Sequence, residues 1–420
     1  MRSEADGSMP HDPASLLGRL DTLARCTDGA GVLTRLYLTP AHEAAIRLAR
    51  GWMQQAGLAT RLDAAATLVG RLEGSDPDAR TLLIGSHLDT VPDAGRYDGA
   101  LGILAGLAAL ERLRDRDIRL PFAVELLAFG DEEGVRFART LTGSRACAGT
   151  LDAALHLASH DAEGITLRDA LSAFGCDPDR LGDAAYRPDR VIAYLEPHIE
   201  QGPVLEQAAL PLGVVTAINA ASRFIVTVCG EAGHAGTVPM DSRRDALATA
   251  AEMIVATRGA GLAWPGVTAT VGQIRAWPGG VNVIAGEVEF SLDLRASTDA
   301  LRDKACAALF HEWDAITAEH GVTHSIAPGF SASAAPCAED WQARLERAAI
   351  ACGLETKRLP SGAGHDAMAM AALCPIAMLF VRCRGGISHN PAESITGQDA
   401  ELAVDVIVRL LEDLAAEGIR

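Results

Sequence analysis

The order of secondary structure that decides the fold lies in three consecutive stretches between residues 81 and 133. They read TLLIGSHLD (81–89), LGILAGLAALERLRD (101–115) and FAVELLAFGDEE (122–133). The first and the third are apolar runs of strand length that end abruptly in polar residues. The second has the length of a helix and is apolar at its start and charged at its end. Strand, helix and strand in this order predict a mostly parallel sheet flanked by helices, which is an α/β fold.

A different pattern runs from residue 219 to residue 332. Residues 242–258 and 298–320 have helical patterns, with Asp241 or Ser242 as N-cap of the first helix. The predicted strands around these helices are RFIVTVCGEA (223–232), VTATVGQIRA (267–276), EVEFSLDLR (287–295) and VTHSIA (322–327). This βαββαβ order predicts a ferredoxin-like α+β domain inserted in the chain.

The two patterns together predict two domains, one interrupted by the other. After residue 335 a helix, the strand PIAMLFVRC (375–383) and a closing helix complete the first domain. We therefore expect a discontinuous catalytic domain of residues 1–218 and 333–420 and an inserted domain of residues 219–332.

The composition excludes several kinds of partner. The 420 residues carry 37 Lys and Arg against 55 Asp and Glu, a net charge of −18 that repels nucleic acid and anionic lipid.

No window is long and apolar enough to span a membrane, and MRSEADGSMP at the start has no apolar segment of a secretory signal. The nine Cys are scattered and form no C-x-x-C pair, as expected of a reducing compartment. We expect a cytoplasmic protein without nucleic-acid or membrane partners.

Five polar clusters rich in His, Asp and Glu follow the predicted strands. Each is flanked by Gly or Pro, which permit sharp turns. The carboxyl ends of parallel strands meet at one edge of a sheet, so these side chains are expected to converge. Imidazole and carboxylate together suit Zn, Mn or Co. The clusters are Gly85–Thr90, Tyr97–Gly99, Gly130–Gly134, Glu196–Gly202 and Gly386–Pro391.

Seven motifs in a fixed order give the chain a family resemblance that runs from about residue 30 to the end. It resembles the amidase, hydantoinase and carbamoylase branch of the M20 metallopeptidase-like hydrolases. This group includes N-carbamoyl-L-amino-acid hydrolases, allantoate amidohydrolases and β-alanine synthases. The motifs are GSHLDTV, YDG, GDEEG, EPHIEQG, GHAGTVPM, SGAGHDA and GISHNPAES.

The resemblance implies two divalent metal ions per subunit, whose identity the sequence does not give. Asp98 would bridge the ions, with His87 and His198 on one side and Glu133 and His389 on the other. Peptidases of the family usually have a carboxylate where His198 stands, so EPHIEQG points to the carbamoylase branch. Asp89, two residues after His87, would hold that imidazole.

The resemblance also implies a mechanism. A metal-bridging hydroxide attacks the carbamoyl carbon, and Glu132 acts first as general base and then as acid. His234 of the inserted domain would stabilise the oxyanion; the alternative is a histidine that caps a turn.

Substrate recognition is assigned by resemblance as well. The inserted domain would form a homodimer and close over the site, so its residues act either in cis or across the dimer. For Arg295 and Asn282 the alternatives are a surface ion pair and a turn residue. The substrate-binding residues are expected to be Gln201, Asn282, Arg295, Gly364 and His365.

The expected activity is hydrolysis of the carbamoyl or ureido group of a small carboxylate, with release of ammonia. N-carbamoyl-L-amino acids and allantoate fit equally well. An M20 aminoacylase or dipeptidase is the alternative within enzymes, and a non-catalytic metal-binding protein is the alternative outside them. The presence of Glu132 speaks against the last.

Overall fold

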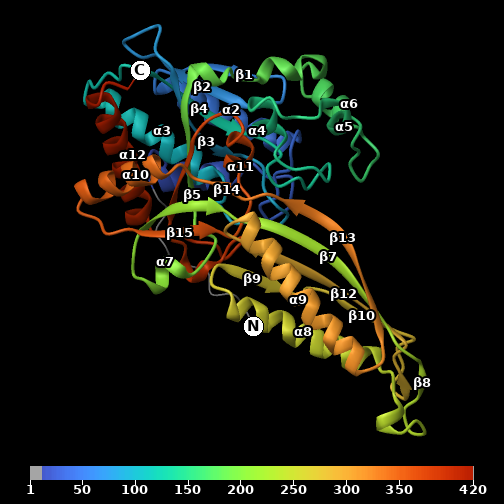
Figure 1. The fold of residues 1–420 in the computed structure, drawn as a ribbon. Helices are drawn as coiled ribbons and strands as arrows, with labels where there is room; N and C mark the ends of the chain where they lie inside the picture. Colours follow the sequence, from blue (N-terminus) through green and yellow to red (C-terminus); the bar gives the residue numbers. More distant parts are fainter. Residues whose placement is uncertain (1–11, 420) are drawn as a thin grey trace. The chain divides into compact units, whose positions relative to one another are not determined.

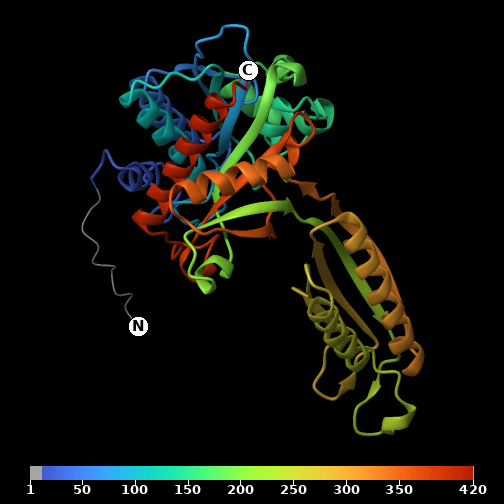
Figure 2. The ribbon, with the colours of Figure 1, turned by 60° about the vertical axis from the view of Figure 1, so that its left-hand side comes forward.

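The chain forms two compact units, here seen in a computed structural model that describes residues 12–419. The stretch MRSEADGSMP, on which the expectation about a secretory signal rests, lies outside the described residues. The first unit comprises the described chain up to Thr216, residues Cys337–Leu359 and the chain from His365 onward. The second comprises residues Ala217–Pro336 and Pro360–Gly364. Figures 1 and 2 colour the chain from blue at its N-terminus to red at its C-terminus.

The centre of the first unit is a largely parallel sheet, as the sequence predicts (Figure 1). Its strands run in the order β1-β2-β4-β3-β5-β16-β6, and the short strands β14 and β15 also pair with β6. The four central strands, β4, β3, β5 and β16, are mutually parallel, whereas the outer pairs are antiparallel. The bounds are β1 (Ala59–Leu62), β2 (Leu68–Leu72), β3 (Thr81–His87), β4 (Ala123–Phe129), β5 (Val191–Ile199), β6 (Leu212–Ile218), β14 (Ala335–Pro336), β15 (Lys357–Ser361) and β16 (Ile376–Val381).

Helices cover this sheet and bury its apolar side chains. Helix α3 (Ala100–Asp115) packs on β3 and β5, and α12 (Gly397–Ala416) packs on α3 and on α10 (Glu339–Ala351), as Figure 2 shows. These helices share one aliphatic core with the sheet. Because all seven residues of β3 and all seven of β4 are buried, both faces of these strands are covered. The remaining helices of the unit are α1 (Leu16–Leu23), α2 (Pro40–Gln55), α4 (Thr142–Cys147), α5 (Ala153–Leu157), α6 (Leu167–Ala173), α7 (Val204–Gln207) and α11 (Ala367–Met370).

Two glycines let α3 begin close to the sheet. Gly99 has a φ of +67°, and a Cβ at this position would lie 2.5 Å from the His87 carbonyl oxygen. A Cβ at Gly102 would lie 2.1 Å from the Pro197 carbonyl oxygen. Only residues without a side chain allow this approach, which brings the segment before α3 against the ends of β3 and β5.

The second unit is a five-stranded antiparallel sheet with two helices. Its strands run in the order β10-β12-β7-β13, and β9 also pairs with β12. Helices α8 and α9 pack on each other and on the sheet, around a core that contains Phe290 and Trp313. The elements are β7 (Ala220–Cys229), β8 (Gly233–His234), α8 (Ala246–Ala263), β9 (Val267–Thr270), β10 (Ile274–Trp277), β11 (Val283–Ile284), β12 (Glu287–Ala296), α9 (Asp299–Glu319) and β13 (Thr323–Ala332).

Two local predictions in this unit are wrong. The N-cap of α8 is Asp245, not Asp241 or Ser242, because the Asp245 carboxylate accepts hydrogen bonds from the free N–H groups of Leu247 and Ala248. Residues 267–276 form two strands rather than one. The strand is interrupted at Gly272, where the backbone N–H groups of Gly272 and Gln273 donate to the side-chain hydroxyl of Ser291 in β12 instead of to a backbone carbonyl.

Within residues 12–419, no helix is both long enough and apolar enough to cross a bilayer.

Candidate metal centre

Five metal ligands predicted from the sequence come together at the carboxyl ends of the parallel strands. Asp98 lies between them. Its Oδ1 is 3.2 Å from His198 Nε2 and 3.6 Å from His87 Nε2. Its Oδ2 is 3.3 Å from His389 Nε2, and that nitrogen is 3.4 Å from Glu133 Oε1. The ligand atoms thus form two groups that share Asp98.

The two buried histidines present bare nitrogens to Asp98. Nδ1 of His87 lies 2.9 Å from the backbone oxygen of Asp89, and Nδ1 of His198 lies 2.9 Å from that of Ile199. A carbonyl oxygen only accepts, so each Nδ1 carries the hydrogen and donates it. In the neutral ring, Nε2 is then an acceptor that faces a carboxylate oxygen, which is also an acceptor. Such a contact is stable only with a cation or a proton between the two atoms, so these residues fit a metal ion.

The electrostatics of the cluster support the same conclusion. Burial lowers the pKa of His87, but the hydrogen bond with Asp98 and the charges of Glu132 and Asp89 outweigh it, so that this pKa lies well above the usual value. Burial raises the pKa of Asp98, but the bonds with three histidines hold it well below the usual range. The anionic cluster therefore attracts cations, and protons compete with metal ions for it.

Asp89 connects the first histidine to the loop after β4. Its backbone carbonyl holds the His87 ring, whereas its carboxylate Oδ1 is 3.9 Å from Nδ1 of that ring. Instead, the carboxylate accepts hydrogen bonds of 3.2 Å from the backbone N–H groups of Glu132 and Glu133. The sequence interpretation assigned the side chain of Asp89 to the imidazole, and the geometry assigns it to the Glu132-Glu133 loop.

The loop after β4 places two consecutive carboxylates in the site. Asp131 has a φ of +66° and Gly134 one of +63°, which turn the chain sharply on either side of the pair. Glu133 belongs to the group with Asp98 and His389, while Glu132 groups with His87 and Glu133. Burial, with the charge of Glu133, raises the pKa of Glu132 well above its usual value, and burial raises that of Glu133 to about 7. Bound cations would lower both again.

Two predicted substrate-binding residues border the centre in the first unit. Gln201, in a left-handed backbone conformation with φ +57°, donates from Nε2 to Asp98 Oδ2 at 3.0 Å and to Ser388 Oγ at 3.2 Å. The buried ring of His365 lies 4.4 Å from the ring of His198 in a T-shaped contact. Burial, with the charge of His198, lowers the pKa of His365 well below its usual value, so this ring is neutral.

Four other predicted residues belong to the second unit, which is described by itself. His234 in β8 is exposed, and its Nδ1 accepts from the N–H of Gly236 at 3.0 Å. Asn282 precedes β11, and its backbone oxygen accepts from Ala235 at 2.9 Å. The pairing of Val283 with His234 places these two predicted residues side by side.

Arg295 is the penultimate residue of β12, and its guanidinium is bound by neighbouring groups. Nε and Nη2 bind the carboxylate of Asp293 at 2.8 and 3.0 Å. Nη1 donates to the backbone oxygen of Gly362 at 2.6 Å, two residues before Gly364. The ion pair that the sequence offered as the alternative for Arg295 is therefore present. It occupies the Nε and Nη2 groups of the guanidinium that was expected to bind a substrate carboxylate.

Sequence interpretation missed several buried residues around the centre. Glu196 accepts from Ser86 Oγ and from the N–H of Ala367, and burial raises its pKa to about 8. Ser388 and Glu393 contact the Asp98 segment. All of them lie inside motifs quoted for the resemblance, so their position beside the predicted ligands was the available signal. Their contacts required the fold.

Comparison with known proteins assigns the chain to a family. The family model described as peptidase family M20/M25/M40 matches residues 83–413. The chain belongs to this family, and within it to the amidase, hydantoinase and carbamoylase group, as its motifs predict.

Individual relatives show which reactions occur among the proteins that this chain resembles. An N-carbamoyl-L-amino acid amidohydrolase of Geobacillus stearothermophilus is 42% identical, with 92% of this chain and 94% of that protein aligned. An allantoate deiminase of Arabidopsis thaliana is 41% identical over 94% of this chain and 81% of its own. The crystal structure of a hydantoinase/carbamoylase family amidase from Burkholderia ambifaria superposes with a TM-score of 0.89 at 37% identity, covering 96% of this chain and 98% of that one. The prediction of a hydrolase that acts on carbon–nitrogen bonds other than peptide bonds is confirmed.

Proposed function

We propose that the chain hydrolyses the carbamoyl or ureido group of an N-carbamoyl-L-amino acid or of allantoate, with two divalent metal ions per subunit. The observation that carries the proposal is the pair of ligand groups that share Asp98, with Glu132 beside them. Two named relatives act on these two substrates by their names. Zn, Mn and Co all suit the His and carboxylate ligands.

The residues of the chain divide the reaction between them. Bound ions would lower the pKa of a water and polarise the carbonyl to be attacked. Glu132 takes the proton from the attacking water on its carboxylate and delivers it to the departing nitrogen. One water is consumed, and the amine, ammonia and carbon dioxide are the products. His87, His198, Glu133 and His389 keep the ions in place around Asp98.

We propose that the second unit is an inserted ferredoxin-like domain that closes over the site. Its strand order β10-β12-β7-β13 with two helices supports this assignment. His234 would donate a hydrogen bond to the oxyanion. Asn282, Arg295, Gly364 and, from the first unit, Gln201 and His365 would bind the substrate. For this role Arg295 has to exchange part of its contact with Asp293 for the substrate carboxylate.

A panel of substrates tests the activity. Ammonia release is measured from Mn- or Zn-loaded protein with N-carbamoyl-L-amino acids, allantoate, ureidoglycolate, N-carbamoyl-β-alanine and N-acetyl amino acids. We expect ammonia from one of the first two. Glu132→Gln protein, loaded in the same way, is the control for contaminating activity. Cleavage of N-acetyl amino acids alone would replace the proposal with the aminoacylase alternative.

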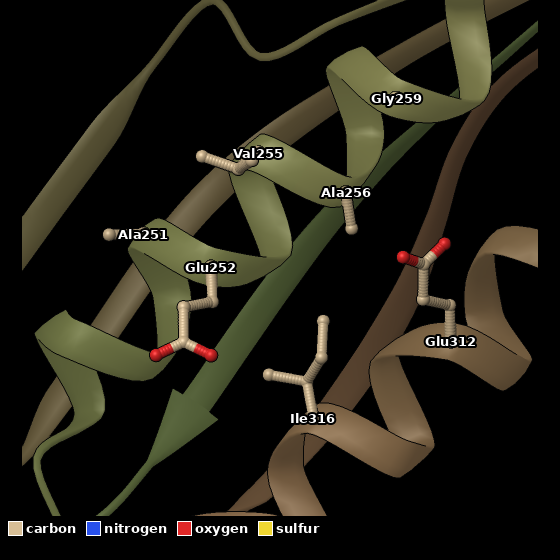
Figure 3. Close-up of a pocket in the computed structure, with 7 residues that line it drawn as sticks. All are labelled: Ala251, Glu252, Val255, Ala256, Gly259, Glu312 and Ile316. Carbon is tan, nitrogen blue, oxygen red and sulfur yellow. The ribbon is translucent and has the colours of Figure 1, made fainter. Parts of the chain in front are cut away.

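We also propose that the protein is a homodimer through the second unit. Besides the charged residues Glu252 and Arg258, the outer face of helix α8 carries large apolar side chains: Val255 is 69% and Leu262 72% exposed. Large apolar side chains on the outer face of a helix are often covered by a partner. Between α8 and α9 lies a pocket of ≈ 550 Å³, into which Ala256 and Ile316 project (Figure 3). A second copy of the chain would cover this face.

Mass measurement by light scattering tests the dimer. Val255→Glu places a charge on the proposed interface and should halve the mass. Ile350→Glu is the matched control, because Ile350 is an equally exposed apolar residue (67%) on α10 of the first unit. Equal masses for Val255→Glu and the unaltered protein would contradict the proposed interface.

Mixing two variants that are each inactive at a substrate concentration well below the raised KM of Arg295→Ala decides whether the second unit acts in cis or across the dimer. A Glu132→Gln subunit keeps Arg295, and an Arg295→Ala subunit keeps Glu132. If Arg295 serves the partner's site, the mixed dimer contains one complete site and regains activity. If it acts in cis, the mixture stays inactive.

A further inference from the structure

Glu393 is a buried carboxylate close to the candidate metal centre that neither the ligand set nor the general base uses. We propose that Glu393 is a positioning residue that ties the segment of Asp98 to the loop of His389, and so holds together the two groups of metal ligands. The inference rests on the proposed two-ion centre. It assigns to Glu393 no contact with an ion or with substrate.

One oxygen of Glu393 fixes the backbone on which Asp98 stands. Oε1 accepts hydrogen bonds from the N–H of Tyr97 at 2.8 Å and from the N–H of Asp98 at 3.2 Å. Two consecutive backbone N–H groups directed at one carboxylate oxygen define the orientation of the peptide planes there. The direction in which the Asp98 side chain leaves the backbone is thereby set by Glu393.

The other oxygen of Glu393 reaches the residue before His389. Oε2 accepts from Ser388 Oγ at 3.0 Å, and Ser388 Oγ is also 3.1 Å from Asp98 Oδ2. A hydroxyl has one hydrogen, so Ser388 donates to only one of these carboxylates at a time. Glu393 and Asp98 therefore share this hydrogen, and Asp98 Oδ2 is the oxygen that faces His389.

The side chain of Glu393 is closely packed in a space that a neighbouring glycine leaves open. Glu393 is only 4% exposed. A Cβ at Gly95 would lie 2.3 Å from its Cβ, its Cδ and its Oε1. Gly95, although its φ is unexceptional, thus leaves the space into which Glu393 inserts. Among the described residues no salt bridge reaches Glu393, so N–H and O–H donors alone satisfy this carboxylate.

The alternative is that Glu393 stabilises the fold without acting on the centre. In that case its loss would lower stability, while the two ions would still bind side by side. In our proposal its loss lets the segment of Asp98 and the loop of His389 move independently. Because Asp98 is shared by both ligand groups, the ions would then bind more weakly and would no longer be coupled through one bridge.

Mn²⁺ binding and electron paramagnetic resonance separate the two possibilities. Metal-free protein is titrated with Mn²⁺ in competition with a chromophoric chelator, and the loaded protein is examined for the spin-coupled signal of a bridged Mn pair. Glu393→Ala should weaken the binding of the second Mn²⁺ about 10–100-fold and remove the coupled signal. Glu393→Gln, which keeps an acceptor for the two N–H groups but no longer accepts from Ser388, should lie in between.

Asp63→Ala is the matched control. Asp63 Oδ1 also accepts from two backbone N–H groups, those of Ala65 and Thr67, at 2.9 and 2.8 Å, but it touches no residue of the centre. It should lower the midpoint of thermal unfolding without changing Mn²⁺ affinity or coupling. Ser388→Ala keeps the role testable if Glu393→Ala does not fold, and it too should weaken the coupled signal.

The outcomes are distinct. Wild-type Mn²⁺ affinity and coupling in Glu393→Ala and Ser388→Ala would overturn the role of Glu393 and leave the metal centre standing. Failure of the unaltered protein to bind two coupled Mn²⁺ ions would overturn the two-ion centre, and the inference with it.

Discussion

Replacing Asp89 with Asn separates the two contacts of this residue, that of its backbone carbonyl with His87 and that of its carboxylate with the Glu132-Glu133 loop. The carbonyl oxygen that holds His87 is part of the backbone and is unchanged by the substitution. The carboxylate that accepts from Glu132 and Glu133 becomes an amide with one acceptor oxygen and one NH₂ group. One of the two backbone N–H groups then faces a donor and loses its partner.

The magnitude follows from that lost partner. A buried N–H without an acceptor costs about 1–3 kcal/mol, so unfolding in urea should show a loss of this size. A displaced Glu132 should lower kcat about 10–100-fold, because misplacement of a catalytic group by about 1 Å has effects of that order. Since Glu133 moves with the same loop, the ion held by Glu133 and His389 should bind more weakly.

Metal titrations of reference variants provide the assay. His389→Ala defines the loss of one ligand group and His198→Ala the loss of the other. In Asp89→Asn, the affinity for the ion held by Glu133 and His389 should fall, but by less than in His389→Ala. The affinity for the ion held by His87 and His198 should equal that of the unaltered protein. A pattern like that of His198→Ala, or an unchanged kcat, would refute the division of labour assigned to Asp89.

Three further predictions address the base, the substrate carboxylate and the stability of the fold. Glu132→Gln should lower kcat about 10²–10⁴-fold while both ions remain bound, which elemental analysis and turnover assays check together; retained turnover would exclude Glu132 as the base. Arg295→Ala should raise KM for carboxylate substrates, and an unchanged KM would remove its role in binding them. Burial lowers the pKa of His42 to about 3, from an ordinary value of 6.5. Below pH 6.5 the unfolded chain thus binds a proton that the folded chain excludes, and stability falls from pH 6.5 towards pH 3. Between pH 7 and pH 5 the loss is about 2 kcal/mol. Because buried carboxyls such as Glu133 titrate in the same range with the opposite sign, the His42 contribution is measured as a difference between two chelator-treated proteins. The unfolding free energy of His42→Gln relative to the unaltered protein should rise by about 2 kcal/mol from pH 7 to pH 5; an unchanged difference would assign the pH dependence to other groups.

The sequence predicts the parallel sheet well because burial leaves a direct signature in it. Strands β3 and β4 are covered on both faces, so most of their residues are apolar or small, with Glu125 as the charged exception inside β4, and further polar residues gather where the strands end. The start of α8 was predicted less well. Asp241, Ser242 and Asp245 are all acceptable N-caps, and only the backbone path of residues 240–245 selects Asp245.

The candidate site shows the same limit at the level of contacts. Spacing and motif order identify Asp98 and the residues grouped around it, because each stands at a strand end. They do not show which atom of Asp89 holds His87, since carbonyl and carboxylate belong to one residue. Nor do they reveal Glu393, whose partners Tyr97 and Asp98 lie almost 300 residues away in the chain and meet it only in the folded protein.

The left-handed backbone at three site residues has a consequence for engineering. Asp131, Gln201 and His389 have φ values of +66°, +57° and +53°, a conformation that costs a residue with a side chain on the order of 1–3 kcal/mol. Glycine at any of them would relax the backbone. At Gln201 and His389 it would also remove a side chain that borders or belongs to the centre, and at Asp131 it would remove the carboxylate that accepts from Thr142 beside the Glu132-Glu133 loop. A screen for thermostability alone should therefore recover glycine variants at these positions that are stable but inactive. Such a screen for this protein needs an activity assay beside the stability measurement.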